Sequence, residues 1–213
     1  MSRKLLSSMA NQASKERLDA MPSGSYLSAR QCALELGISY TPVREAFLRL
    51  QKEGVLRQVP NVGFFIQNVD LTDIFQLFQV RECVELFALD KVFAKLAEKH
   101  MDQLRRLCGV LEEARRAGVS YRYTELDAAF HRISLEQLGN RPLLGLYDNT
   151  RARYQIISGQ LLPLIDEDVQ REHREFVQAV ERRDLALARQ SLQLHIQGMK
   201  RRIIDIYVSD RLT

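Results

Sequence analysis

Four side chains in the last two thirds of the chain have the chemistry of metal ligands. Asp127 and His131 are four residues apart, so on a helix they share a face. His173 and His195 follow on two further predicted helices, and the apolar residues around His195 turn it toward a core. Three imidazoles and one carboxylate on three helices of a bundle suit a divalent transition metal ion. From spacing alone, hydrogen-bonded core histidines that bind no metal are the commoner explanation of such a pattern.

A second group of residues, near position 44, could contact DNA. Val43, Phe47 and Leu50 recur at helical spacing and predict one buried face. Arg44 lies on the opposite face, where it could donate to O6 and N7 of a guanine if this helix enters the major groove. Other cations suited to phosphates are Arg30, Arg49 and Lys52. The plainer alternative is a solvated, charged helix face.

The elements that must position these cations are helices and a hairpin. A first helix is expected over residues 5–20. Ser28 and Gln31 form a capping-box pattern for a helix ending at Gly37, and Ser39 can cap the next helix, which ends at Gly54. Apolar runs at 55–59 and 64–66 flank a turn and predict a hairpin. Residues 1–68 are thus predicted to form a winged helix-turn-helix DNA-binding domain.

The rest of the chain, residues 69–213, is predicted to be an all-helical domain. Six helices fit, at about 71–99, 102–117, 120–137, 141–160, 166–182 and 185–208. The fold class is therefore mainly α, with the winged domain followed by an antiparallel six-helix bundle. Arg81 and Glu85 lie on or beside the buried face of the first of these helices, as an ion pair or facing a cavity. His100, at a predicted helix end, is expected to cap a C-terminus.

Composition narrows the class of protein. The chain has 213 residues and a formal net charge of +4. Residues 1–68 hold nine Lys and Arg against five Asp and Glu, and the remainder holds 22 of each, so the whole excess lies in the predicted DNA-binding domain. We find no membrane-spanning or secretory segment. Three scattered cysteines are typical of reduced thiols, and a cytoplasmic protein is expected.

One stretch resembles a known family. Residues 37–50, GISYTPVREAFLRL, followed by 53–56, EGVL, are similar to the DNA-binding module of GntR-family bacterial transcription regulators. Val80-Arg81 and Glu85 fit the start of the effector domain, called FCD, in the FadR-like branch, and its length is closer to the six-helix (VanR-type) subtype. With this resemblance the expected DNA contacts are Arg30, Ser39, Tyr40, Thr41, Arg44, Arg49, Lys52, Asn61 and Gly63.

The chain departs from the family pattern in three places. Tyr40 and Val62 stand where the family commonly has arginine, and the usual Pro-Gly pair is spread over residues 22–24. The first two departures remove potential phosphate or base contacts. We therefore expect DNA binding to depend less steeply on salt than it would with arginine at both positions.

The resemblance also implies a ligand sensor. Asp127, His131, His173 and His195 match the family's metal-site pattern, for zinc, nickel or manganese. A small organic acid would bind the metal, and the residues expected beside it are Arg81, Tyr147, Arg151 and Tyr154. The partners implied are a second copy of the chain and a near-palindromic operator in double-stranded DNA, with repression as the expected action and no membrane partner.

Three alternatives stay open at this point. The metal could be purely structural. The chain could be a metal-dependent hydrolase with an N-terminal docking module, although we find no phosphate loop, nucleophile motif or well-placed base, since Glu125 and Glu172 are expected to point away from the ligands. It could also be an interaction scaffold for acidic proteins.

Overall fold

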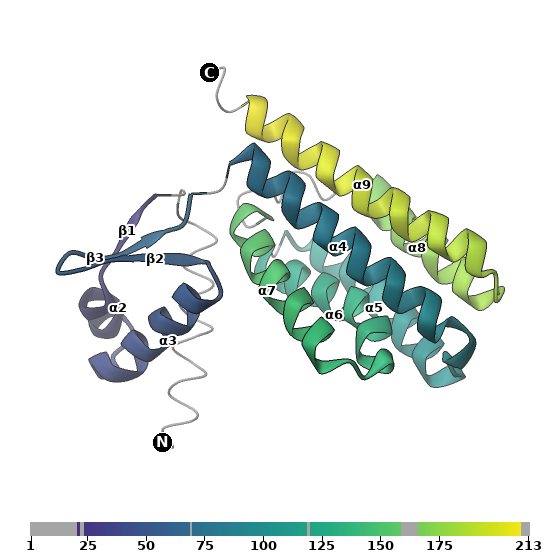
Figure 1. Ribbon diagram of the computed structural model, residues 1–213, viewed down its shortest axis with the longest axis horizontal. Helices are drawn as coiled ribbons and strands as arrows, with labels where there is room; N and C mark the ends of the chain where they lie inside the picture. Colours follow the sequence, from purple (N-terminus) through teal and green to yellow (C-terminus); the bar gives the residue numbers. More distant parts are fainter. Residues whose placement is uncertain (1–20, 22–23, 69, 119, 159–165, 210–213) are drawn as a thin grey trace. The chain divides into compact units, whose positions relative to one another are not determined.

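The computed structural model describes residue 21 and residues 24–68, 70–118, 120–158 and 166–209 (Figure 1). The chain divides into two compact units. The first comprises residues 1–69 and 152–160, and the second comprises residues 70–151 and 161–213. The helix predicted over residues 5–20 lies outside the described residues.

In the first unit, the described residues form two helices of their own, α2 (Ala29–Glu35) and α3 (Tyr40–Lys52), and a three-stranded antiparallel sheet. The strands are β1 (Tyr26–Leu27), β2 (Leu56–Val59) and β3 (Gly63–Ile66). The strand order is β1-β3-β2, and Figure 1 shows both helices on one side of the sheet. The predicted hairpin is the β2–β3 pair, whereas β1 was not predicted because two residues are too short for a periodic pattern.

Local sequence explains where these helices begin and what they bury. The Oγ atom of Ser28 accepts a hydrogen bond from the backbone N–H of Gln31 and caps α2, as predicted. The predicted apolar face of α3 is buried, with Val43, Phe47 and Leu50 at 1% exposure or less. The ring of Phe47 meets that of Phe64 edge to face, so α3 is fixed to β3 and its opposite face points to solvent.

The described residues of the second unit form a bundle of six α-helices with one short 3-10 turn. The helices are α4 (Leu71–Val92), α5 (Glu98–Arg116), α6 (Ser120–Leu138), α7 (Arg141–Ser158), α8 (Glu167–Glu181) and α9 (Leu185–Ser209), and the turn is η1 (Phe93–Lys95). Helix α4 packs against α6 and α9, and α8 packs against α5 and α9, so α4 and α9 run side by side (Figure 1). The carboxylate of Asp184 accepts from the N–H of Leu187 and caps α9, as predicted.

The first predicted helix of this unit is too long. It ends at Val92, and Leu96 and Ala97 have extended backbone before α5 begins. His100 therefore lies in the first turn of α5, where its Nδ1 accepts a hydrogen bond of 2.9 Å from the N–H of Ala97. The prediction of a C-terminal cap is wrong, because this imidazole supports a helix start.

Within the part of the chain that the structure describes, each helix is too short or too polar to cross a lipid bilayer.

Candidate metal centre and nucleic-acid interface

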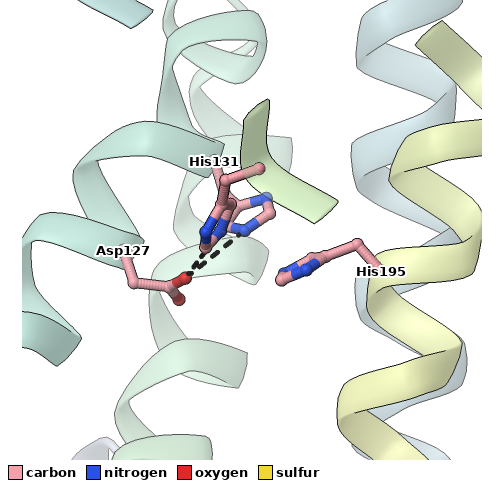
Figure 2. A group of neighbouring side chains, drawn as sticks. Asp127, His131 and His195 are labelled. Carbon is pink, nitrogen blue, oxygen red and sulfur yellow. Dashed lines mark ion pairs between the residues drawn. The ribbon is translucent and has the colours of Figure 1, made fainter. Parts of the chain in front are cut away.

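The four predicted ligands converge inside the helical unit. Asp127 and His131 come from α6, His173 from α8 and His195 from α9, and each is 7% exposed or less. One potential ligand atom from each residue lies within 4.8 Å of those of the other three. Figure 2 shows Asp127, His131 and His195 pointing toward one another from helices on opposite sides of the cluster. The structure thus brings together residues that are up to 68 positions apart (127 to 195) in the sequence.

The spacing of the ligand atoms suits a single ion. Oδ1 of Asp127 lies 3.5 Å from Nε2 of His131 and 3.3 Å from Nε2 of His173. Two ligands at about 2.1 Å from one zinc ion, at a tetrahedral angle, would lie about 3.4 Å apart. Nε2 of His195 is buried and has no hydrogen-bond partner among the described residues, which is what a nitrogen reserved for a metal requires.

Glu85 contacts the Nδ1 side of His131, and Arg81 in turn contacts Glu85. Nε of Arg81 donates to Oε1 of Glu85 at 2.6 Å, and Oε2 of Glu85 lies 2.9 Å from Nδ1 of His131, with all three side chains buried. Burial alone would raise the pKa of Glu85, but Arg81 and His131 outweigh it and lower the pKa to about 2. Glu85 is therefore a carboxylate that touches a candidate ligand, a contact that the sequence did not predict.

Glu172 contacts His195 in the same way as Glu85 contacts His131. Its Oε2 lies 3.0 Å from Nδ1 of His195, and its Oε1 accepts from Nη2 of Arg202 at 2.9 Å. The prediction that Glu172 points away from the ligands is wrong. The reason is tertiary: α8 packs along α9, so the residue before His173 faces a different histidine on the neighbouring helix. Helical spacing on α8 alone carries no signal for this contact.

Asp127 has an arginine of its own. Nη2 of Arg151 lies 3.0 Å from Oδ2 of Asp127 and also donates to the carbonyl oxygen of Thr124. Burial would raise the pKa of Asp127, but Arg151 and His131 more than offset it and hold the pKa well below its usual range. Asp127 is therefore ionised, with Oδ2 on the guanidinium and Oδ1 toward the imidazoles.

Burial affects two of the histidines in the opposite sense. Burial lowers the pKa of His173, and burial holds the pKa of His195 well below its usual value, with the guanidinium of Arg81 adding to the effect. Both rings are therefore neutral at physiological pH. A neutral imidazole is the form that binds a metal ion.

Three of the residues expected beside an effector, Arg81, Tyr147 and Arg151, are buried in the helical unit. Arg81 and Arg151 are engaged as described above. The hydroxyl of Tyr147 donates to the carbonyl oxygen of Ala128, and its ring packs with Val84 and Leu135. The side chain of Tyr154 lies outside the described residues.

The predicted DNA contacts lie on the surface of the first unit. Arg30 is at the start of α2, and Ser39 is the N-cap of α3, where its side chain makes no capping hydrogen bond. The exposed side chains of α3 among the predicted contacts are Tyr40, Thr41, Arg44, Arg49 and Lys52. They lie on the side of α3 away from the core, as a helix that enters the major groove requires.

The β2–β3 turn forms a wing with a constrained backbone. Asn61 has a φ of 60° and Gly63 a φ of 146°, and a Cβ atom on Gly63 would lie 2.6 Å from the ring of Tyr26. From the sequence, Arg57 counted only toward the net charge. It is exposed on β2 with its guanidinium 5.2 Å from the ring centre of Phe65, which places one more cation on the wing.

Comparisons with known proteins agree with this arrangement. Residues 16–66 match the family described as bacterial regulatory proteins, gntR family, and residues 76–198 match the FCD domain. An "Uncharacterized HTH-type transcriptional regulator in unstable DNA locus" from Streptomyces ambofaciens is 30% identical over 183 residues, which is 83% of this chain and 75% of the relative. A "Probable D-xylose utilization operon transcriptional repressor" from Paenarthrobacter nicotinovorans is 27% identical over 83% of this chain and 78% of its own length.

A solved structure shares the fold. McbR/YncC of E. coli superposes with a TM-score of 0.83 at 21% identity, over 95% of this chain and 98% of its own. The relatives from Streptomyces and Paenarthrobacter are both named as transcription regulators, not as enzymes, which argues against the hydrolase alternative. With a matching DNA-binding module and a matching effector domain, the chain belongs to the GntR family of DNA-binding transcription regulators and carries a C-terminal FCD domain.

Proposed function

We propose that this regulator is a homodimeric repressor whose binding to operator DNA changes when a small carboxylate binds at a metal ion in its FCD domain. In this scheme residues 1–68 contact DNA, and residues 69–213 bind the effector and the second subunit. The observation that carries the proposal is the buried set of three imidazoles and one carboxylate with converging ligand atoms. Repression is supported by a relative whose name is that of an operon repressor.

The DNA-binding part rests on the exposed face of α3. Arg44 would read a guanine edge through a bidentate contact, which is worth about 1–3 kcal/mol of discrimination. Arg30, Arg49 and Lys52 would neutralise phosphates and fix the register. Two such units in a dimer would meet the half-sites of a near-palindromic operator.

The donor set decides which ions fit. Imidazole suits zinc, nickel, copper and iron, and a carboxylate adds manganese. Asp127, His131, His173 and His195 would hold a divalent zinc, nickel or manganese ion, all through side chains that are already buried and oriented. The neutral state of His173 and His195 favours this, since neither has to lose a proton at physiological pH.

The proposed metal ion and the arginines beside its ligands indicate the chemical class of the effector. A bound divalent ion would supply a Lewis-acidic position for a carboxylate. Arg81 and Arg151 place guanidinium groups next to the ligand residues, and guanidinium is a strong partner for a second carboxylate oxygen. Tyr147 and Tyr154 complete the proposed effector contacts.

Calorimetry of metal-loaded and chelated protein with a panel of small mono- and dicarboxylic acids tests the sensor. We expect at least one acid to bind the loaded form and none to bind the chelated form. If no acid binds either form, the metal is structural and the proposed sensing is wrong.

A mobility-shift assay on the DNA upstream of the protein's own gene tests the division of labour. Arg44→Ala should abolish specific binding, whereas Arg106→Ala, an exposed arginine of the helical unit, should leave it unchanged. His173→Ala should keep DNA binding and lose the response to the acid identified by calorimetry. Loss of DNA binding in His173→Ala with retained folding would contradict the proposed separation of roles.

A further inference from the structure

We propose that Glu85 and Glu172 are positioning residues that hold His131 and His195 in the tautomer with hydrogen on Nδ1, so that Nε2 of each ring is left free for a metal ion. This inference rests on the proposed metal site and assigns two residues that lie outside the ligand set. It concerns where the protons of the imidazoles are before any metal binds.

The contact between Glu85 and His131 fixes one proton. A neutral imidazole has one N–H, and an ionised carboxylate can only accept. Oε2 of Glu85 lies 2.9 Å from Nδ1 of His131, an ion-pair distance, and a carboxylate this close favours the tautomer with hydrogen on Nδ1. The lone pair is then on Nε2, which is the atom that faces Oδ1 of Asp127.

The contact between Glu172 and His195 fixes a second proton by the same logic. Oε2 of Glu172 lies 3.0 Å from Nδ1 of His195. The remaining Nε2 is buried without a hydrogen bond to any described residue. A buried nitrogen in that state is costly unless a ligand uses it, and its tautomer would be undefined without the carboxylate on the other side.

Each carboxylate is itself held in place. Arg81 bonds Glu85 one helical turn away on α4, and Arg202 of α9 bonds Glu172 of α8. Glu172 thus orients the ring of His195 through a hydrogen bond, and Glu85 of α4 orients the ring of His131 through an ion-pair contact. Carboxylates behind metal-binding histidines raise ligand basicity as well as fixing the ring.

His173 offers a comparison within the same site. Within the described part of the chain, its Nδ1 is buried and makes no hydrogen bond, and the nearest carboxylate contact is on its Nε2 side. The structure therefore has two histidines backed by glutamate and one that is not. Any effect of the glutamates should spare His173.

Long-range proton–nitrogen NMR spectra of the metal-free protein test the inference directly, because the two tautomers have different ring nitrogen shifts. We expect His131 and His195 with hydrogen on Nδ1 in the wild type. In Glu172→Leu, His195 should lose that preference while His131 keeps it. Glu172→Gln retains a carbonyl acceptor and should restore part of it. Glu172 is 18% exposed and Arg202 is 19% exposed. The guanidinium of Arg202 therefore stays in contact with water when Glu172 is replaced.

Zinc affinity, measured by competition with a chelator, gives the second readout. Glu172→Leu should weaken zinc binding by about 10–100-fold, with Glu172→Gln in between. Glu175→Leu, an exposed acid one turn further along α8, is the matched control and should leave zinc affinity unchanged. At the other ring Glu85→Gln should weaken zinc binding, and its control Glu82→Gln, which loses a carboxylate bound by Gln193 and Gln197, should not.

The inference is overturned if wild-type His195 has its hydrogen on Nε2, or if Glu172→Leu changes neither the tautomer nor the zinc affinity. If the wild type shows the expected tautomers but binds no zinc, nickel or manganese, the proposed function fails while the placement of the protons stands.

Discussion

The buried pair of Arg81 and Glu85 should be one of the most sensitive points in the helical unit. Both side chains are 2% exposed, and Nε of Arg81 lies 2.6 Å from Oε1 of Glu85. Arg81→Met would leave the carboxylate buried with only His131 beside it. Removing one partner of such a pair costs about 3–5 kcal/mol. For a unit of this size that corresponds to a fall in Tm of roughly 6–20 °C.

The assay is thermal and urea unfolding of chelated protein, followed by circular dichroism at a helix wavelength. Arg105→Met is the matched control. Arg105 contacts Glu98, Asp102 and Glu181, yet it is 45% exposed, so water screens these ion pairs and its loss should lower the stability far less than the loss of Arg81. If the number of ion pairs decided the stability loss, Arg105→Met would be the more destabilising variant. If burial decides it, Arg81→Met is. Equal losses in the two variants would refute the reasoning.

The pH dependence of the two variants sharpens the test. Burial raises the pKa of Glu85, but Arg81 and His131 lower it from 4.5 to about 2, so in the wild type its stabilising effect is present above about pH 4.5 and is lost as the pH falls through about 2. Without Arg81 the effect of burial dominates and the pKa of Glu85 rises. The stability deficit of Arg81→Met should therefore shrink on mild acidification, whereas that of Arg105→Met should not.

Three further predictions use the same protein. Arginine restored at Tyr40 and Val62 together should steepen the log–log salt dependence of DNA binding by about 0.9 per new phosphate contact, and an unchanged slope in a salt titration would refute it. In chelated protein the free energy of unfolding should fall as the pH drops below about 6.5, because burial lowers the pKa of His173 and His195 and the unfolded chain takes up protons first. Urea unfolding at about pH 7.5 and about pH 5.5 measures this, and His173→Gln should reduce the difference. Gly63→Ala should destabilise the wing by about 1–3 kcal/mol and weaken DNA binding, since the backbone has a φ of 146° and a new Cβ would meet an aromatic ring of β1; unchanged DNA affinity would show that the wing is dispensable.

Much of the fold could be predicted because its signals are local. The cap at Ser28, the buried stripe of α3, the turn of the wing and the cap at Asp184 each depend on residues a few positions apart. The end of α4 could not, because residues 93–99 have no strong breaker and the 3-10 turn there is a matter of packing. The strand β1 exists only through pairing with β3, which lies 36 or more positions later.

The candidate metal ligands could be predicted as residue types, but the residues that contact them could not. Asp127 and His131 share a face by helical spacing, and His195 sits in an apolar stripe. The contacts of Glu85 with His131 and of Glu172 with His195 each join two helices, so they depend on how α4 meets α6 and how α8 meets α9. Sequence periodicity describes one helix at a time and contains no information on such pairs.

The distribution of the ligands over α6, α8 and α9 has a consequence for biosynthesis. Asp127 and His131 leave the ribosome well before His195, which lies in α9, 64 positions after His131. A nascent chain or a fragment ending before α9 therefore has an incomplete coordination sphere, unlike a site built from two histidines on one helix. On the proposed metal site, capture of the ion would be a late event that follows completed assembly of the bundle, and a product truncated before α9 should not retain the ion.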